Sequence, residues 1–175
     1  MSFAAFEKAI KSPALRAVAC QWNAARGARP MPAWYDIRPS KIAAQLGIIW
    51  SYHYDRAKDV MTGRLAGDQI EQIFGKTFRG TPMDQLYPPN QFPVMFARFQ
   101  RVVCEPTLYV EDGKVFQLVD HFGYGERIAM PLADDGVTGD GIIGATVYET
   151  FFNFQPQPLP DREQWFSLSS VEALS

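Results

Sequence analysis

The chain has 175 residues, of which 47% are hydrophobic, so it is long enough to bury the core of one domain. Its net charge is −2 with acidic and basic residues interspersed, which leaves no basic face for nucleic acid or an anionic membrane. The N-terminal residues mix acids and bases and contain no uninterrupted apolar segment, so we expect neither a signal peptide nor a spanning helix, and a cytoplasmic protein.

An N-terminal helical extension is predicted over residues 1–29. Apolar residues recur at helical spacing from Phe3 to Ile10, and Ser12-Pro13 then provides an N-cap and a first-turn proline for a second helix, which Gly27 ends. The apolar stripe of these helices must be buried against some surface. We therefore predict that the extension packs on a sheet face or on a second subunit, and that the protein is a homodimer.

A domain over residues 30–153 follows a proline-rich connector. Residues 47–55 are rich in aromatic side chains, and residues 60–65 place Val60, Thr62 and Arg64 on one face of a second strand. The two segments flank a polar turn, which predicts a hairpin. Short helices are expected over residues 68–74 and near residue 83. The longest helix of the domain is expected from Phe92 to Val103, before Glu105-Pro106.

The run from Gly125 to Gly136 predicts the end of one strand and a turn into the next. Its apolar residues alternate with period two, so one face carries Glu126 and the opposite face carries Arg127. Strands are also expected over residues 107–111 and 142–152, with a loop or short element over residues 112–124. Residues 154–175 are expected to be a C-terminal tail that leaves the domain.

This order of elements predicts an α+β fold with a five-stranded antiparallel sheet and helices on one face, preceded by the helical extension. The two cysteines, Cys20 and Cys104, lack the spacing of a zinc site or a redox pair, and we interpret them as buried small side chains.

Several short segments carry a family resemblance when they are taken together. They are Met31-Pro32, Asp36–Pro39, Thr62–Gly67, Phe74-Gly75, Phe78–Gly80 and Glu126–Gly136. In these segments the chain resembles the PAS fold and, within it, a bacterial PAS-like family first catalogued as a domain of unknown function. The resemblance covers residues 30 to 152.

The resemblance implies a non-catalytic signal-sensing or protein-interaction module in bacterial regulation, with a cavity between the sheet and the long helix. No output segment is fused to it, so its signal would pass through a regulatory protein partner. Neither cysteine lies in a flavin photoadduct motif, and the long helix contains no histidine for haem, since the two histidines are His53 and His121. These residues identify no particular cofactor, and we expect neither haem nor flavin to copurify.

No catalytic or metal site is predicted. Asp134, Asp135 and Asp140 do not have the spacing of a calcium loop and are interpreted as turn residues. The glycines near residues 123 and 139 do not complete a nucleotide-binding motif, and serine, histidine and aspartate are too scattered to nominate a triad.

Two groups of residues are assigned to a candidate ligand cavity. Arg64 and Glu126 are expected to meet as an ion pair, which is either structural or leaves Arg64 able to reach an anionic ligand. The walls are assigned to four aromatic residues, Phe92, Phe96, Phe99 and Tyr148, with Phe152 beside them. Two alternatives stay open: a structural adaptor without a ligand, and a small α+β isomerase or hydratase that uses an aspartate or a tyrosine as acid or base.

Overall fold

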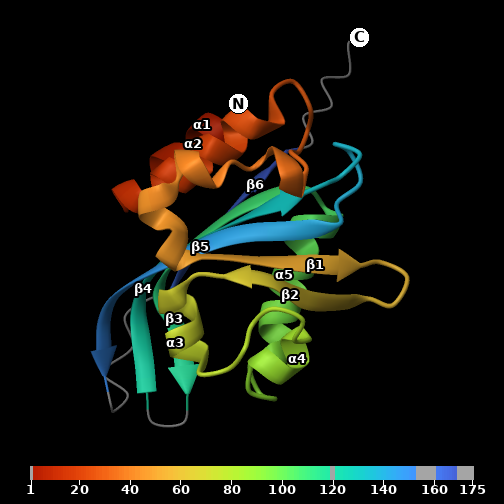
Figure 1. The fold of residues 1–175 in the computed structure, drawn as a ribbon. Coiled ribbons are helices and arrows are strands. Elements are labelled where there is room, and N and C mark those ends of the chain that lie inside the picture. The colour runs from red at the N-terminus through yellow and green to blue at the C-terminus, as the bar shows by residue number, and fades with distance from the viewer. Residues whose placement is uncertain (1, 119–120, 153–160, 169–175) are drawn as a thin grey trace.

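The structure is a computed structural model that describes residues 2–118, 121–152 and 161–168. In it, a six-stranded antiparallel sheet separates two layers of helices (Figure 1). The strand order is β2-β1-β5-β4-β3-β6. The strands are β1 (Ile49–Asp55), β2 (Val60–Ala66), β3 (Thr107–Leu118), β4 (His121–Leu132), β5 (Gly141–Phe152) and β6 (Arg162–Ser167). The α-helices are α1 (Ser2–Ala9), α2 (Pro13–Arg26), α3 (Asp68–Phe74), α4 (Met83–Leu86) and α5 (Phe92–Cys104). Three short 3-10 helices, η1 (Trp34–Asp36), η2 (Pro39–Lys41) and η3 (Ala43–Ile48), connect α2 to β1.

Helices α1 and α2 cover one face of the sheet. The α2 helix begins as predicted, because the Ser12 hydroxyl accepts a hydrogen bond from the Leu15 amide and Pro13 takes the first helical position. The apolar stripe of both helices is buried against residues of β3, β4 and β5, and the Trp22 indole donates to the Pro131 carbonyl at 2.8 Å. Since the chain's own sheet buries this stripe, the stripe gives no reason for a second subunit, and the homodimer stays a prediction.

Helices α3, α4 and α5 cover the opposite face. Here the Trp50 indole lies flat on β5, stacks on Phe99 with ring centroids 4.8 Å apart, and donates to the Thr146 hydroxyl at 2.9 Å. A Cβ atom added at Gly144 would lie 2.1 Å from the Trp50 ring, so glycine is required where the indole crosses the neighbouring strand. An aromatic core thus joins β1 to the long helix.

The expectation of five strands and helices on one face needs correction. Residues 112–124, expected to be a loop or short element, belong mainly to β3 and β4. These two strands pair along their length with a register shift at Lys114/Phe116, and the pairing of β4 with β5 shifts at Tyr124/Gly125. Glycines at positions 113, 123 and 125 and the register shifts break the period-two alternation here, so the sequence shows no regular strand pattern. The α1–α2 layer also makes the sheet covered on both faces.

The sixth strand comes from the segment expected to be a tail. Strand β6 pairs with β3 from Thr107 to Asp112, and its Trp165 ring lies 4.4 Å from the ring of Tyr109. The proline-rich part of the expected tail, residues 155–160, lies outside the described residues, and the division into extension, domain and tail stays a prediction.

The cysteines also differ from expectation. Cys20 and Cys104 are both exposed, so their interpretation as buried side chains is wrong. Cys20 lies on the outer side of α2, where its thiol meets Glu7 of α1. None of the helices in the described parts of the chain has the length and apolar character needed to cross a membrane.

Candidate functional site

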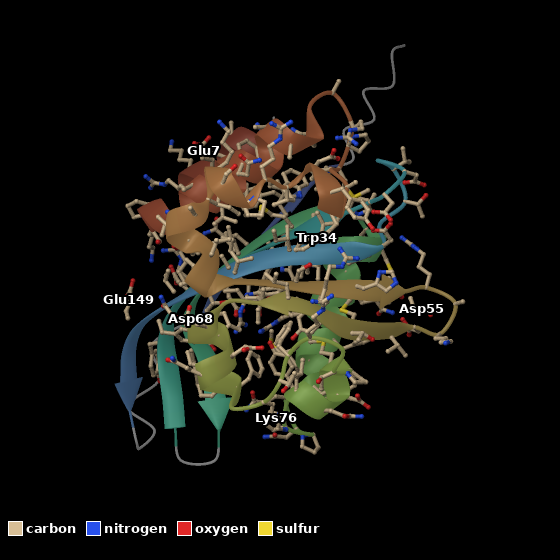
Figure 2. The ribbon with its side chains drawn as sticks, viewed as in Figure 1. Glu7, Trp34, Asp55, Asp68, Lys76 and Glu149 are labelled. Atoms are coloured by element: carbon tan, nitrogen blue, oxygen red, sulfur yellow. The ribbon has the colours of Figure 1, made fainter. Side chains whose placement is uncertain are left out.

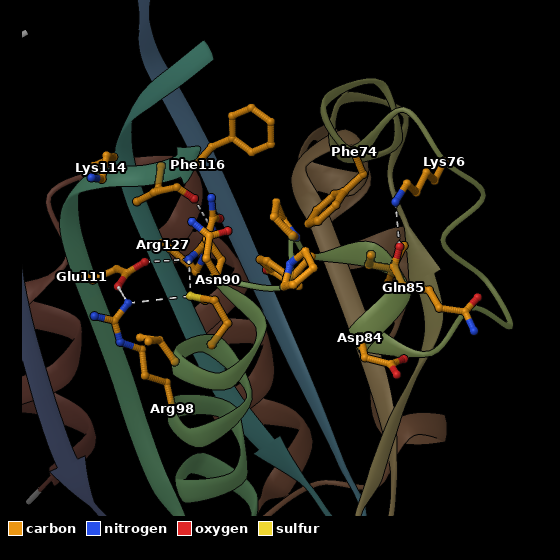
Figure 3. Close-up of a pocket in the computed structure, with 18 of the residues that line it drawn as sticks. Phe74, Lys76, Asp84, Gln85, Asn90, Arg98, Glu111, Lys114, Phe116 and Arg127 are labelled. Atoms are coloured by element: carbon orange, nitrogen blue, oxygen red, sulfur yellow. Dashed lines mark hydrogen bonds and ion pairs between the residues drawn. The ribbon is translucent and has the colours of Figure 1, made fainter. Parts of the chain in front are cut away.

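A cavity of about 600 Å³ lies between the sheet and the helices of the α3–α5 layer (Figure 3). One wall is formed by β3, β4 and α5, and Figure 3 shows Glu111, Arg98 and Arg127 meeting there. The opposite wall comes from the end of α3 and from α4, with the Phe74 ring facing the gap. The cavity therefore lies on the long-helix side of the sheet, but between the β3–β4–α5 wall and α3–α4 rather than between the sheet and the long helix, and none of the six predicted site residues lines it.

A buried ion pair forms the polar part of the strand wall. Glu111 and Arg127 are paired across β3 and β4, and their side chains are only 6% and 5% exposed. The Arg127 Nη1 atom donates to Glu111 Oε1 at 2.6 Å. Its Nε atom donates to the Thr146 hydroxyl at 3.3 Å, and its Nη2 atom donates to the Val115 carbonyl. The guanidinium is thus held on three sides by β3 and β5.

Glu111 receives donors from three elements. Besides Arg127, it accepts from Arg98 of α5 at 3.2 Å and from the hydroxyl of Tyr109. Arg98 also contacts Glu163 of β6, so one guanidinium joins the cavity wall to the sixth strand. Burial is the largest single effect on Arg127 and acts to lower its pKa, but the charge of Glu111 and the neighbouring tyrosines together outweigh it and hold that pKa above its ordinary value. Arg127 consequently stays charged.

Tyrosine hydroxyls gather near Arg127. Burial raises the pKa of Tyr87, which lines the cavity, and raises the pKa of Tyr148 to about 12. Burial also raises the pKa of Tyr52 well above its ordinary value, and the neighbouring Tyr87 adds to that effect. The Tyr52 hydroxyl oxygen is buried and has no partner with hydrogen-bond geometry. These hydroxyls therefore keep their protons at neutral pH and act as donors.

The prediction that Arg64 and Glu126 form an ion pair is wrong, because each side chain contacts other residues. Arg64 of β2 lies 5.0 Å from the centroid of the Trp34 ring, and its Nη2 atom is 3.1 Å from His53 Nδ1. Trp34 lies on the side of the sheet that α1 and α2 cover (Figure 2). The Glu126 carboxylate accepts the amides of Lys11 and Ser12, both at 2.8 Å, and so holds the start of α2.

The period-two pattern of β4 was correct, and only the choice of face was wrong. Ile128 and Met130, which share a face with Glu126, pack in the core beneath α1 and α2, whereas Ala129, which shares a face with Arg127, packs in the core beneath α5. The cavity therefore receives Arg127 rather than Glu126. A charged residue on the face opposite Glu126 was the available signal, and it could be used only after the covering helices were known.

The four predicted aromatic residues separate into three places. Phe99 is fully buried in the core. Phe92 and Phe96, with ring centroids 5.4 Å apart, line a second pocket of about 270 Å³ between α5, α4 and the start of β2. Tyr148 lies near Arg127 and makes an edge contact with Phe116 of the cavity wall. The side chains of Phe152 and His121 lie outside the described residues, and the ligand-binding roles assigned to these aromatics stay predictions.

The acidic residues after β4 form a turn. Asp135 accepts the amides of Val137 and Thr138 at 2.8 and 2.6 Å, and Asp140 accepts the amide of Asp134 at 2.8 Å. The predicted turn role of these aspartates is confirmed. Within the described residues, no group of three or more histidine, cysteine, aspartate or glutamate side chains could hold a metal ion.

Known proteins resemble this chain in sequence and in fold. The sequence model of a family described as PAS domain matches residues 10–147. Among solved structures, the PAS domain from Bordetella pertussis BvgS is similar, with a TM-score of 0.50 and 20% identity over 61% of this chain and 79% of that chain. At this identity the structural likeness concerns the fold alone. No curated protein sequence matches the chain.

Proposed function

The chain belongs to the PAS domain family, and from this premise we propose that it is a non-catalytic sensor that binds a small molecule in the cavity between β3, β4 and the α3–α5 layer. Binding would alter a contact with a regulatory protein partner, which then carries the signal. PAS domains act as sensing or interaction modules, and a cavity of this kind supports sensing by a ligand.

The cavity itself carries the proposal. Its volume of about 600 Å³ lies within the range of about 300 to 1,000 Å³ that is typical of small-molecule sites. Apolar side chains such as Leu86, Val94 and Val115 form much of its lining, and the Arg127–Glu111 pair supplies a fixed polar end. This combination supports a ligand site over an adaptor whose core is filled.

The buried polar groups of the cavity favour binding over proton transfer, and the two aspartates of its lining, Asp84 and Asp161, are exposed. An isomerase or hydratase needs a group that accepts a proton near neutral pH. The tyrosine hydroxyls here have raised pKa values, and the Glu111 carboxylate is already engaged by Arg98 and Arg127. Rigid, satisfied groups of this kind suit recognition of a ligand.

A fragment screen by ligand-observed NMR tests the proposal. We expect a subset of small neutral and anionic compounds to bind the wild-type chain. Val94→Trp should weaken their binding because Val94 lines the cavity and is half exposed, so a larger ring can narrow the cavity without disturbing the core. The matched control is Val137→Trp, in the exposed turn before β5. The proposal fails if no compound binds, or if binding to the Val94→Trp variant is unchanged.

A further inference from the structure

We infer that the second pocket, of about 270 Å³, is a docking site for a partner protein, and that it receives an apolar side chain with arginine or lysine next to it in the partner's sequence. The pocket lies between α5, α4 and the start of β2 and adjoins the ligand cavity at α4. This inference rests on the proposed function, because the partner is the regulatory protein that the proposed sensor contacts.

The lining of this pocket is mainly apolar and open to solvent. Phe92 and Phe96 are one turn apart on α5 and only half buried, although both are large aromatic side chains. Met61 and Met83, each 1% exposed, lie beneath them, and Val60 at the edge is 38% exposed. The volume is below the range of about 300 to 1,000 Å³ that is typical of small-molecule sites. The pocket therefore suits a side chain of a partner better than a whole ligand.

Two carboxylates at the edge of the pocket lack a cationic partner. Asp59 and Asp84 both line it and are exposed, and within the described part of the chain neither is in an ion pair. The Asp59 Oδ1 atom accepts from the Tyr54 hydroxyl at 2.6 Å and from the Gln100 amide at 2.8 Å. Both donors are neutral, so the carboxylate is held in place with its charge unbalanced. A basic residue beside the partner's apolar side chain would complement this charge.

The basic residues around the pocket are engaged elsewhere. None of them lines it. Arg98 pairs with two glutamates of the sheet. Lys76 lines the ligand cavity, and its Nζ atom binds a backbone carbonyl of α4 at 2.8 Å. In the β1–β2 turn, Arg56 donates to a backbone carbonyl in the turn before β5, and Asp55 accepts the amide of Lys58 and balances its charge. No cation of the described residues therefore pairs with the two carboxylates of the pocket.

Helix α4 places the docking pocket where a partner can respond to a ligand. Asp84 and Gln85 line both this pocket and the ligand cavity. The helix has only four residues and contacts both β2 and α5. A ligand that moved α4 would consequently change the shape of the docking pocket as well.

NMR titration of the isotope-labelled full chain with three short capped peptides tests the inference. The first peptide has one leucine between two arginines, the second has glutamates in place of the arginines, and the third has glycine in place of the leucine. We expect the first peptide to bind about tenfold more tightly than either of the others, because it alone supplies both the apolar side chain and the complementary charge. Its binding should shift the amide signals of Val60 and Phe96, which line only the docking pocket.

A double variant tests the role of the two carboxylates. Asp59→Asn combined with Asp84→Asn removes both charges and keeps the size of the side chains. Asp59 has a φ of 53°, a left-handed conformation that asparagine also adopts, and an asparagine oxygen can still accept from the two neutral donors. This variant should raise the Kd of the arginine peptide about fivefold or more. The matched control, Asp68→Asn combined with Glu149→Gln, removes two exposed charges that line neither pocket and should change that Kd by less than about twofold.

Several results would overturn the inference. They are no binding of the arginine peptide at millimolar concentration, equal Kd values for the arginine and glutamate peptides, and an equal loss of affinity in the two double variants. Shifts confined to Val94 and Val115, which line only the ligand cavity, would also overturn it. The titrations use the chain without a ligand in its cavity. Their failure therefore leaves the proposed function standing, and failure of the fragment screen leaves the docking site standing.

Discussion

Replacing either member of the Glu111–Arg127 pair should destabilise the fold, and the two replacements should differ in cost. Among the described residues, Glu111 is the only carboxylate in an ion pair with Arg127, whereas Glu111 also holds Arg98 at 3.2 Å and the Tyr109 hydroxyl. Glu111→Gln therefore leaves a buried cation without its counter-charge. Arg127→Met leaves a carboxylate that still has a cationic partner.

The expected losses of unfolding free energy follow from this difference between the two variants. Glu111→Gln should lower the free energy of unfolding by about 3 to 5 kcal/mol, which is typical when one partner of a buried pair is removed. Arg127→Met should cost about 2 to 3 kcal/mol, since the hydrogen bonds to Thr146 and Val115 are lost but the remaining carboxylate stays compensated. The double variant should show a coupling of about 0.5 to 3 kcal/mol.

Urea unfolding of the full chain, followed by circular dichroism, measures all three variants. The control is Glu105→Gln, which breaks the exposed Arg101–Glu105 pair within and just after α5 and should cost no more than about 0.5 kcal/mol. A larger loss for Arg127→Met than for Glu111→Gln would refute the asymmetry. Additivity within about 0.3 kcal/mol would show that the two charges do not interact.

Three further predictions use the same unfolding measurement. The losses of unfolding free energy caused by Arg64→Met and Glu126→Gln should add within about 0.5 kcal/mol in the double variant, because the two residues have no shared partner. A larger coupling would mean that the two side chains contact each other. Gly144→Ala should lower the free energy of unfolding by about 1 to 3 kcal/mol because its methyl group would overlap the indole of Trp50. An unchanged urea midpoint of unfolding would contradict that packing. Burial raises the pKa of Tyr148 from 10.0 to about 12, so the folded chain retains a proton that the unfolded chain releases; stability that is complete below pH 10 should fall as the pH rises toward 12, and a stability that stays constant between pH 10 and pH 12 would contradict this.

Local sequence signals predicted much of the fold. The N-cap at Ser12, the β1–β2 hairpin and the long helix all formed where the pattern indicated, because each depends on residues close together in the chain. The outer half of the β3–β4 hairpin and strand β6 were missed. Their strands are defined by pairing with a neighbour, and glycines, polar residues and a register shift interrupt the alternation of their apolar residues, so no regular local pattern marks them.

The sequence indicated the side of the sheet on which the candidate site lies, but neither its walls nor its residues. Alternation along β4 correctly separated Glu126 from Arg127, yet which of them faces the cavity depends on where α2 packs, and that is a contact between distant parts of the chain. The role of Arg98, which lies in a mainly apolar helix, could not be predicted for the same reason. Its partners, Glu111 and Glu163, lie on two strands that meet it only after folding.

A crystal structure of the full chain bound to the tightest compound from the fragment screen tests the central claim most directly. The account predicts that the compound lies in the 600 Å³ cavity, with its polar end toward Arg127 and its body between Leu86 and Val115. A compound found instead in the smaller pocket at Phe92 and Phe96, or on the α1–α2 side of the sheet, would contradict the claim that the cavity is the sensing site.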